Sequence, residues 1–168
     1  MKDEQPALTF REARTGNDYE NAAALFKAYA GTLDIDLGFQ DFDNELKNIR
    51  SEYGRPHGVI IIALKNEKEY IGCAGVRKFE GSICELKRMY VVKAARGEGI
   101  GKALLQKAVE AARALGYAKM RLDTLPAMQR AIQLYEKEGF YEIAPYRYNP
   151  VAGTRYYEKE LKRYHTVK

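Results

Sequence analysis

Hydrophobic and polar positions alternate, or form short apolar runs, in seven segments of the chain, and both patterns predict β-strands. These segments are 7–13, 58–64, 70–79, 83–92, 119–124, 140–143 and 154–161. Between them, apolar residues recur at the three- and four-residue spacing of helices. The first expected helix begins near Asn17 and Asp18, which offer N-caps, and the others cover 41–52, 100–115 and 127–138.

The order of these elements limits the fold. One strand and two helices precede three consecutive strands, and a helix, a strand, a helix and two strands follow. Three consecutive strands form a meander, which excludes a purely doubly wound parallel sheet. We therefore predict a mixed α/β (α+β) fold with helices on both faces of the sheet. No repeat or linker interrupts the chain, so residues 1–168 are expected to form a single domain.

The composition is typical of a soluble globular protein, with 46% hydrophobic and 30% charged residues. Cys73 and Cys84 lie in apolar runs without metal-like spacing, so we expect neither a disulfide nor a metal site. No apolar run approaches the roughly 18 residues that a membrane span needs. The first residues, M-K-D-E-Q-P, lack the apolar core of a signal peptide. A cytoplasmic protein without membrane contact is expected.

The net charge of +5 favours acidic partners or ligands. It does not by itself choose between nucleotides, nucleic acid and acidic proteins. Lysine and arginine are interleaved with acidic residues and form no long basic block. A basic surface for nucleic acid is therefore not expected.

The glycine-rich segment R-G-E-G-I-G-K, residues 96–102, lies between a predicted strand and a predicted helix. It matches neither of two well-known phosphate loops, because Arg96 and Lys102 stand where those motifs need glycine, and Ala103 where one needs serine or threonine. Glycine still lets main chain approach a ligand closely, and the first N–H groups of the following helix attract anions. The segment predicts either an anion-binding loop or a tight turn whose glycines serve geometry alone.

The pattern R-x-x-G-x-G, formed by Arg96, Gly99 and Gly101, resembles the acetyl-CoA loop of the GNAT superfamily of N-acetyltransferases. The segment E-L-K-R-M-Y-V (85–91) is similar to the fourth strand of that family, and L-Y-E-K-E-G-F (134–140) resembles its penultimate helix. The similarity covers nearly the whole chain. It implies a sheet splayed between its fourth and fifth strands, and transfer of acetyl from acetyl-CoA, as co-substrate, to an amine.

The resemblance assigns coenzyme A binding to two stretches. The pantetheine arm would lie along Met89, Tyr90 and Val91, where the splayed sheet leaves main-chain groups unpaired; the side chains of Met89 and Val91 are expected to pack in the core. Backbone N–H groups of the loop would bind the pyrophosphate. The loop residues are Arg96, Gly97, Glu98, Gly99, Ile100, Gly101 and Lys102.

Glu85 is a carboxylate in the otherwise apolar run I-C-E-L, and burying it unpaired would be unfavourable. One explanation is an ion pair with Arg77 or Arg121 on adjacent strands. The resemblance implies another, because many relatives use a glutamate at this position as the general base that deprotonates the amine. Both explanations stay open for Glu85.

Tyr135 matches the tyrosine that protonates the leaving thiolate in many relatives. Its alternative role is packing on Phe140 as part of an amphipathic helix. Met128 departs from the family pattern, because relatives often have asparagine at this place, three residues before an alanine that is here Ala131. One hydrogen bond to the cofactor is therefore expected to be missing or supplied elsewhere.

The resemblance does not fix the acceptor, which is expected to be the amine of a small molecule, an amino acid or a peptide. We expect its cleft between the first two helices and the last two strands, with Arg147 and Arg155 as candidate partners for an acidic acceptor. Aromatic residues of these segments would line the cleft: Phe26, Tyr29, Phe39, Tyr146 and Tyr148.

Neither cysteine has the context of a nucleophile, which favours direct transfer without a covalent enzyme intermediate. The alternative function is a module that binds acyl-CoA without doing chemistry. Dimers are common among the relatives, and we expect 154–161 to be an edge strand through which a homodimer could pair.

Overall fold

A computed structural model of the chain describes residues 4–161. Its centre is a seven-stranded sheet with the order β1-β2-β3-β4-β5-β7-β6. Neighbouring strands run antiparallel except β4 and β5, which are parallel. The expected mixed, mostly antiparallel sheet is therefore confirmed. The strands are β1 (Leu8–Glu12), β2 (Val59–Lys65), β3 (Glu69–Glu80), β4 (Ile83–Val91), β5 (Lys119–Thr124), β6 (Tyr141–Ile143) and β7 (Arg155–Glu160).

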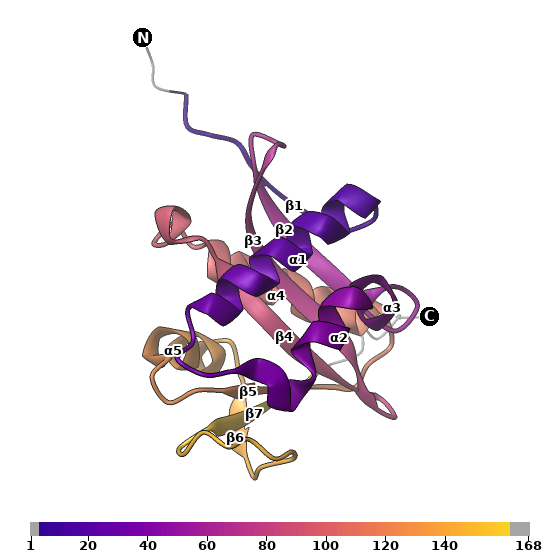
Figure 1. The fold of residues 1–168 in the computed structure, drawn as a ribbon, viewed down its shortest axis with the longest axis vertical. Helices are drawn as coiled ribbons and strands as arrows, with labels where there is room; N and C mark the ends of the chain where they lie inside the picture. The colour runs from indigo at the N-terminus through magenta and orange to yellow at the C-terminus, as the bar shows by residue number, and fades with distance from the viewer. Residues whose placement is uncertain (1–3, 162–168) are drawn as a thin grey trace, which may run out of the picture.

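Helices cover both faces of this sheet. In Figure 1, α1, α2 and α3 lie in front of the strands and α4 lies behind them. No helix within residues 4–161 is both long and apolar enough to cross a membrane. The α-helices are α1 (Gly16–Gly31), α2 (Phe42–Lys47), α3 (Ile49–Tyr53), α4 (Ile100–Ala114) and α5 (Gln129–Lys137), and the 3-10 turns are η1 (Leu37–Gln40) and η2 (Lys93–Ala95).

The side chains of β2 explain how the sheet is buried on both faces. Ile61 and Ala63 belong to the core that α4 covers, whereas Ile60, Ile62 and Leu64 belong to the core that α1 covers. A strand buried on both faces requires a continuous apolar run, which V-I-I-I-A-L provides. Full burial of each such large side chain contributes about 2 kcal/mol of hydrophobic stabilisation.

β4 and β5 are paired only along their first residues. Their register ends where Glu85 lies opposite Arg121, although both strands continue beyond these residues. Arg88, with a φ of +58°, lies where the register between β3 and β4 shifts by one residue. The expected splay is confirmed, and it leaves the main chain of residues 86–91 without a partner strand on the β5 side.

Two expectations about the N-terminal helices are wrong. Thr15 caps α1, because its hydroxyl accepts a hydrogen bond from the backbone N–H of Asp18 at 3.1 Å while the Asp18 carboxylate accepts one from the N–H of Thr15 at 3.1 Å. Asn17 and Asp18 therefore lie inside the helix. The single helix expected over 41–52 is interrupted, because Asn48 leaves the helical region with φ −110° and ψ 25°.

The expectation that residues 154–161 form an edge strand is also wrong. β7 pairs with β5 on one side and with β6 on the other. β6 comes earlier in the chain but takes the outer position, so β1 and β6 are the edges of the described sheet. The main-chain groups of β7 are therefore already used within the chain.

Candidate active site

A groove of about 700 Å³ lies where β4 leaves β5. Its walls come from α1, the end of β4, the glycine-rich loop with the start of α4, and the segment that leads into α5. The lining includes eight of the ten residues expected to bind coenzyme A, namely Met89, Tyr90, Val91, Arg96, Gly97, Gly99, Ile100 and Gly101. The open main chain of β4 and the loop thus face one cavity.

The two remaining residues of the loop point elsewhere. Glu98 and Lys102 are exposed and do not line this groove. Glu98 instead lines a separate cavity of about 400 Å³ that Pro6 and Ile71 also line. Any contribution of these two residues to the groove would come from their backbone.

The glycine-rich loop turns sharply at two glycines before α4. Gly97 has a φ of +89° and Gly99 a φ of +77°, both in the left-handed region that favours glycine. Gly99 is the N-cap of α4 and supplies no side-chain cap. The first N–H groups of α4 therefore lack intrahelical partners beside the groove, and the helix dipole adds positive potential there.

Arg96 ties the loop to the end of β4. Its Nε donates a hydrogen bond to the carbonyl oxygen of Val91 at 3.0 Å. Its guanidinium carbon also lies 5.7 Å from the ring centre of Tyr90, a cation–π arrangement. These contacts hold the loop against the end of β4, so the two parts of the groove wall keep their relative position.

Glu85 is surrounded by donors from three parts of the chain. Its carboxylate is only 1% exposed. It accepts hydrogen bonds from the Tyr146 hydroxyl at 2.9 Å and from an Arg147 amino group at 3.1 Å. Arg77 Nε lies 3.5 Å away and Lys87 Nζ 4.0 Å away. The ion pair expected with Arg77 is thus present.

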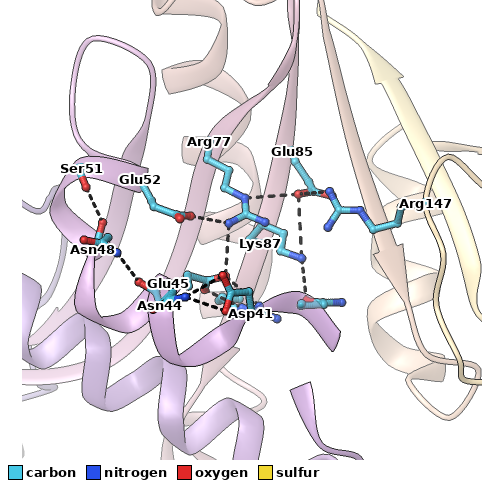
Figure 2. Close-up of polar contacts among 12 residues, drawn as sticks. Asp41, Asn44, Glu45, Asn48, Ser51, Glu52, Arg77, Glu85, Lys87 and Arg147 are labelled. Carbon is cyan, nitrogen blue, oxygen red and sulfur yellow. Dashed lines mark hydrogen bonds and ion pairs between the residues drawn. The ribbon is translucent and has the colours of Figure 1, made fainter. Parts of the chain in front are cut away.

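Figure 2 shows Glu85 between the guanidinium groups of Arg77 and Arg147. On its other side, Arg77 contacts Glu45 at 3.3 Å and Glu52 at 2.7 Å, both on the α2–α3 segment. The network therefore links β3 and β4 to the helices that cover them. Arg121, the other expected partner of Glu85, instead pairs with Glu158 at 2.7 Å.

Lys87 is a buried lysine next to this network. Its side chain is 3% exposed, and its ammonium donates a hydrogen bond to the side-chain oxygen of Gln40 at 3.0 Å. Burial lowers the pKa of Lys87 to about 8, against the raising effect of the nearby Glu85 charge. A buried cation here requires the carboxylate of Glu85 as its partner.

Tyr135 lies on the buried face of α5 and packs on Phe140 with ring centres 5.8 Å apart, as its packing role requires. Its hydroxyl has no hydrogen-bond partner among residues 4–161. The side chain lines a cavity of about 70 Å³ together with Met89 and Met128. Burial, together with the electrostatic influence of Tyr29 and Asp123, raises the pKa of Tyr135. The phenol therefore keeps its proton at neutral pH and can donate it.

The sequence model of the Acetyltransferase (GNAT) family matches residues 21–140, which include the open strand, the loop and α5. The chain belongs to this family. An uncharacterized N-acetyltransferase of Schizosaccharomyces pombe is 35% identical over 157 residues, which cover 93% of this chain and 96% of that protein. The resemblance of the three motifs to GNAT proteins is confirmed.

Two solved structures share the GNAT fold. A GNAT-family acetyltransferase from Staphylococcus aureus superposes with a TM-score of 0.77 at 24% identity, covering 93% of this chain and all of that one. A Salmonella typhimurium protein solved with its cofactor acetyl-CoA gives a TM-score of 0.64 at 19% identity, covering 96% of this chain and 98% of that one. At these identities the likeness concerns the fold.

The aromatic residues expected around the acceptor of this GNAT chain fall into different environments. The expectation that Phe26 lines the cleft is wrong. Phe26 is fully buried in the core under α1, where its ring centre lies 5.4 Å from that of Tyr53. Tyr148 is 79% exposed, and Tyr146 binds Glu85. Tyr29 lines the groove and two smaller cavities beside it. The side chain of Phe39 lies outside the described part of the chain.

Both arginines considered for an acidic acceptor contact carboxylates of the chain. Arg147 binds Glu85, and Arg155 pairs with Glu142 and lies 3.7 Å from Glu136. Met128 accepts a weak hydrogen bond from the Thr124 hydroxyl, with the sulfur 3.9 Å from the oxygen. Its thioether therefore stands in the groove wall where many GNAT proteins carry an amide.

Sequence reasoning missed Asp123 of β5. One of its carboxylate oxygens, Oδ2, is buried and has no hydrogen-bond partner among the described residues. The residue lines both small cavities next to the groove. The sequence R-L-D-T carries the signal, because an acidic residue in a short strand next to the splay resembles the position of Glu85.

Proposed function

We propose that this GNAT protein transfers the acetyl group of acetyl-CoA directly to an amine acceptor, which is a small molecule, an amino acid or a peptide. The observation that carries the proposal is the groove itself. An unpaired strand edge, two left-handed glycines and the free N–H groups of α4 line one cavity of about 700 Å³. Family membership and the acetyl-CoA-bound fold relative support the same ligand.

Each part of the groove has a counterpart in the chemistry of coenzyme A. Backbone amides of the loop would hold the pyrophosphate, as helix N-termini hold anions in general. The open main chain near Met89, Tyr90 and Val91 would bind the amides of the pantetheine arm. The bound thioester supplies an activated acetyl group, and the residues at the splay would orient the amine toward it.

Glu85 is proposed as the group that accepts the proton of the amine. It is buried at the last paired position of β4, beside the splay. Tyr146 and Arg147, which bind it, belong to the loop on the acceptor side. The competing role is purely structural, because the same contacts join three segments of the chain.

Tyr135 is proposed to protonate the leaving thiolate. Its hydroxyl has no competing hydrogen bond among residues 4–161, and its pKa, raised by burial, means that it is protonated at neutral pH. The cavity that it lines shares Met89 and Met128 with the groove. A positioned general acid of this kind contributes about 10²–10⁴ in rate.

The first test is calorimetric titration of acetyl-CoA into the parent protein and into Gly101→Ala. A methyl group at Gly101 would lie 3.9 Å from Leu134 and 4.0 Å from Val91, ordinary contacts that the fold accommodates. Helix propensity favours alanine by about 1 kcal/mol, so the variant is expected to be at least as stable as the parent. We expect its affinity to fall at least tenfold, because the methyl group occupies the groove.

Gly16→Ala is the matched control, since Gly16 opens α1 and an added methyl group meets nothing within 4 Å. It is expected to bind acetyl-CoA like the parent. If the parent does not bind acetyl-CoA, the proposal fails.

The role of Glu85 is tested with Glu85→Gln in an assay of thiol release from acetyl-CoA with a panel of amines. A base role predicts a loss of kcat/KM of at least a hundredfold in a variant that folds and binds acetyl-CoA. A structural role predicts a lower free energy of unfolding with normal kcat/KM per folded molecule. Acetyl-CoA binding without thiol release for any amine would favour the module that binds acyl-CoA without chemistry.

A further inference from the structure

Asp123 lies beside the splay, on the strand opposite Glu85. It stands two residues beyond Arg121, the last residue of β5 that pairs with β4. On its other side β5 remains paired, with Asp123 opposite Tyr156 of β7. The position is therefore rigid on one side and open to the cavities at the splay on the other.

The carboxylate of Asp123 has no ion-pair partner within the described part of the chain. Its Oδ2 is buried without a hydrogen-bond partner, and no ion pair within 4 Å reaches Asp123 from residues 4–161. The nearby cations have closer partners. Lys87 contacts Gln40 and Glu85, although the charge of Asp123 also acts to raise its pKa. Arg88 binds Glu45 through two contacts of 2.9 Å. Asp123 as a whole is half-buried, but a buried carboxylate oxygen without a donor is unfavourable, so the bare Oδ2 points to a ligand.

Two cavities meet at this carboxylate. One of about 30 Å³ is lined by Asp123, Gln40 and Asn149, with apolar walls that include Leu33 and Leu125. The other, of about 70 Å³, is lined by Asp123 and by Tyr135, and it shares residues with the groove. Asp123 therefore stands between the acceptor side and the proposed acid of the transfer.

The acceptor must bring a nitrogen to this place. An aliphatic amine has a pKa near ~10 and is an ammonium ion at neutral pH. An ammonium group has three N–H donors and a compact charge, which suits a single carboxylate in a small cavity. The cavities are narrow, about 30 and 70 Å³, which limits the group behind the nitrogen to an unbranched carbon. Leu33 and Leu125 offer apolar contacts to it.

We propose that Asp123 binds the ammonium group of the acceptor, which is a primary aliphatic amine with an unbranched carbon next to the nitrogen. This inference rests on the proposed acetyl transfer. An N–H of the ammonium donates to Oδ2 of Asp123, and this places the nitrogen beside the groove. Arg88 also lines both cavities, and its charge is offset by Glu45, which it contacts twice at 2.9 Å.

The test measures binding and needs no turnover. Propylammonium chloride and 1-propanol, which have the same shape and differ in charge, are titrated into the coenzyme A-loaded protein and followed by amide chemical shifts. The parent is expected to bind propylammonium at least tenfold more tightly than propanol. Asp123→Asn is expected to abolish this preference, because the amide lacks the charge.

Asp34→Asn is the control, since Asp34 is exposed between two residues that line the smaller cavity. It removes one negative charge nearby and is expected to keep the preference. Asp123→Ala is a second variant that removes the carboxylate without leaving an amide. If the parent shows no preference for the ammonium, or if Asp123→Asn and Asp123→Ala retain it, the inference is overturned.

Failure of this inference can be told apart from failure of the proposed function. If the Asp123 variants lose the ammonium preference and still bind acetyl-CoA like the parent, the inference and the proposed function are both supported. A parent that binds acetyl-CoA and releases thiol with amines, but shows the same kcat/KM after Asp123→Asn, overturns the inference alone. A parent that binds no acetyl-CoA overturns the proposed function.

Discussion

Arg147 and Glu85 are 62 positions apart in the sequence, yet a guanidinium nitrogen of Arg147 lies 2.9 Å from a carboxylate oxygen of Glu85. Arg147 belongs to the loop between β6 and β7, and Glu85 to the last paired position of β4. The contact fastens the acceptor-side loop to the strand at the splay. Because Glu85 is almost fully buried, water screens this ion pair weakly.

Replacing Arg147 with methionine removes one of the donors of this buried carboxylate. We expect Arg147→Met to lower the free energy of unfolding by about 1–2 kcal/mol, since Arg77 and Tyr146 still contact Glu85. Urea denaturation measures the change. Arg155→Met is the control, because its partners are about half exposed. Exposed ion pairs contribute little to stability, so this variant is expected to lose less stability than Arg147→Met. Equal losses in both variants would contradict the prediction.

Tyr135→Phe removes a hydroxyl without a hydrogen-bond partner in the described part of the chain. The free energy of unfolding and the affinity for acetyl-CoA are therefore expected to stay unchanged, while kcat falls about a hundredfold. Steady-state kinetics and calorimetry check the two halves of this prediction. Tyr157→Phe is the counterpart, because it removes a hydrogen bond to Glu136 of 2.9 Å and should cost about 1 kcal/mol of stability without changing kcat. A normal kcat in Tyr135→Phe would contradict the acid role and show that Tyr135 serves packing only.

Lys87 is expected to make the free energy of unfolding depend on pH in the alkaline range. Burial lowers its pKa from 10.5 to about 8, so the folded state holds fewer protons than the unfolded state between these values. Below pH 8 the cost of burying the charge is present in full, and it is relieved as the pH rises toward 10.5. The shift corresponds to about 3 kcal/mol.

We therefore expect the parent to gain stability relative to Lys87→Met between pH 8 and pH 10. Urea denaturation of both proteins at a series of pH values measures the difference. Lys47→Met, at an exposed position of α2, controls for the loss of one positive charge. A difference between the parent and Lys87→Met that stays constant over this range would show that Lys87 is not buried as a cation.

Asp18 is expected to make the free energy of unfolding depend on pH in the acid range. Its carboxylate accepts two hydrogen bonds from Arg11, at 2.7 and 2.8 Å, and one from the Tyr70 hydroxyl at 2.7 Å. The Arg11 guanidinium lowers the pKa of Asp18 well below its usual range. This stabilisation is present above the unfolded pKa near 4 and is lost as the pH falls below it.

Asp18→Asn is expected to lower the free energy of unfolding by about 1–2 kcal/mol at pH 7, because it breaks a half-buried ion pair with Arg11 and a capping box. The difference from the parent should shrink between pH 5 and pH 2. Denaturation curves at these pH values measure it, with Asp43→Asn on the exposed face of α2 as control. A difference in stability between Asp18→Asn and the parent that does not change with pH would contradict the ionic origin of the stabilisation.

The sequence allowed prediction of the elements whose cause is local. The run V-I-I-I-A-L requires burial on both faces, and it forms β2 between two cores. The glycines at 97 and 99 permit the left-handed turn before α4. The alternation in the fourth strand identified Glu85 as a carboxylate in an apolar place. Periodicity and φ preference act within a few residues, so a single sequence carries them.

The tertiary structure alone decided which distant groups meet. The outer position of β6 depends on its pairing with β7, which comes later in the chain. Glu85 pairs with Arg77 and Arg147, whereas Asp123, an acidic residue of similar sequence context, forms no ion pair with any residue between 4 and 161. Side-chain pairs across more than thirty residues depend on how strands and loops stack, and no local preference encodes this. The sequence thus determined the elements and the loop, and the fold decided which carboxylate is paired and which faces the cavity.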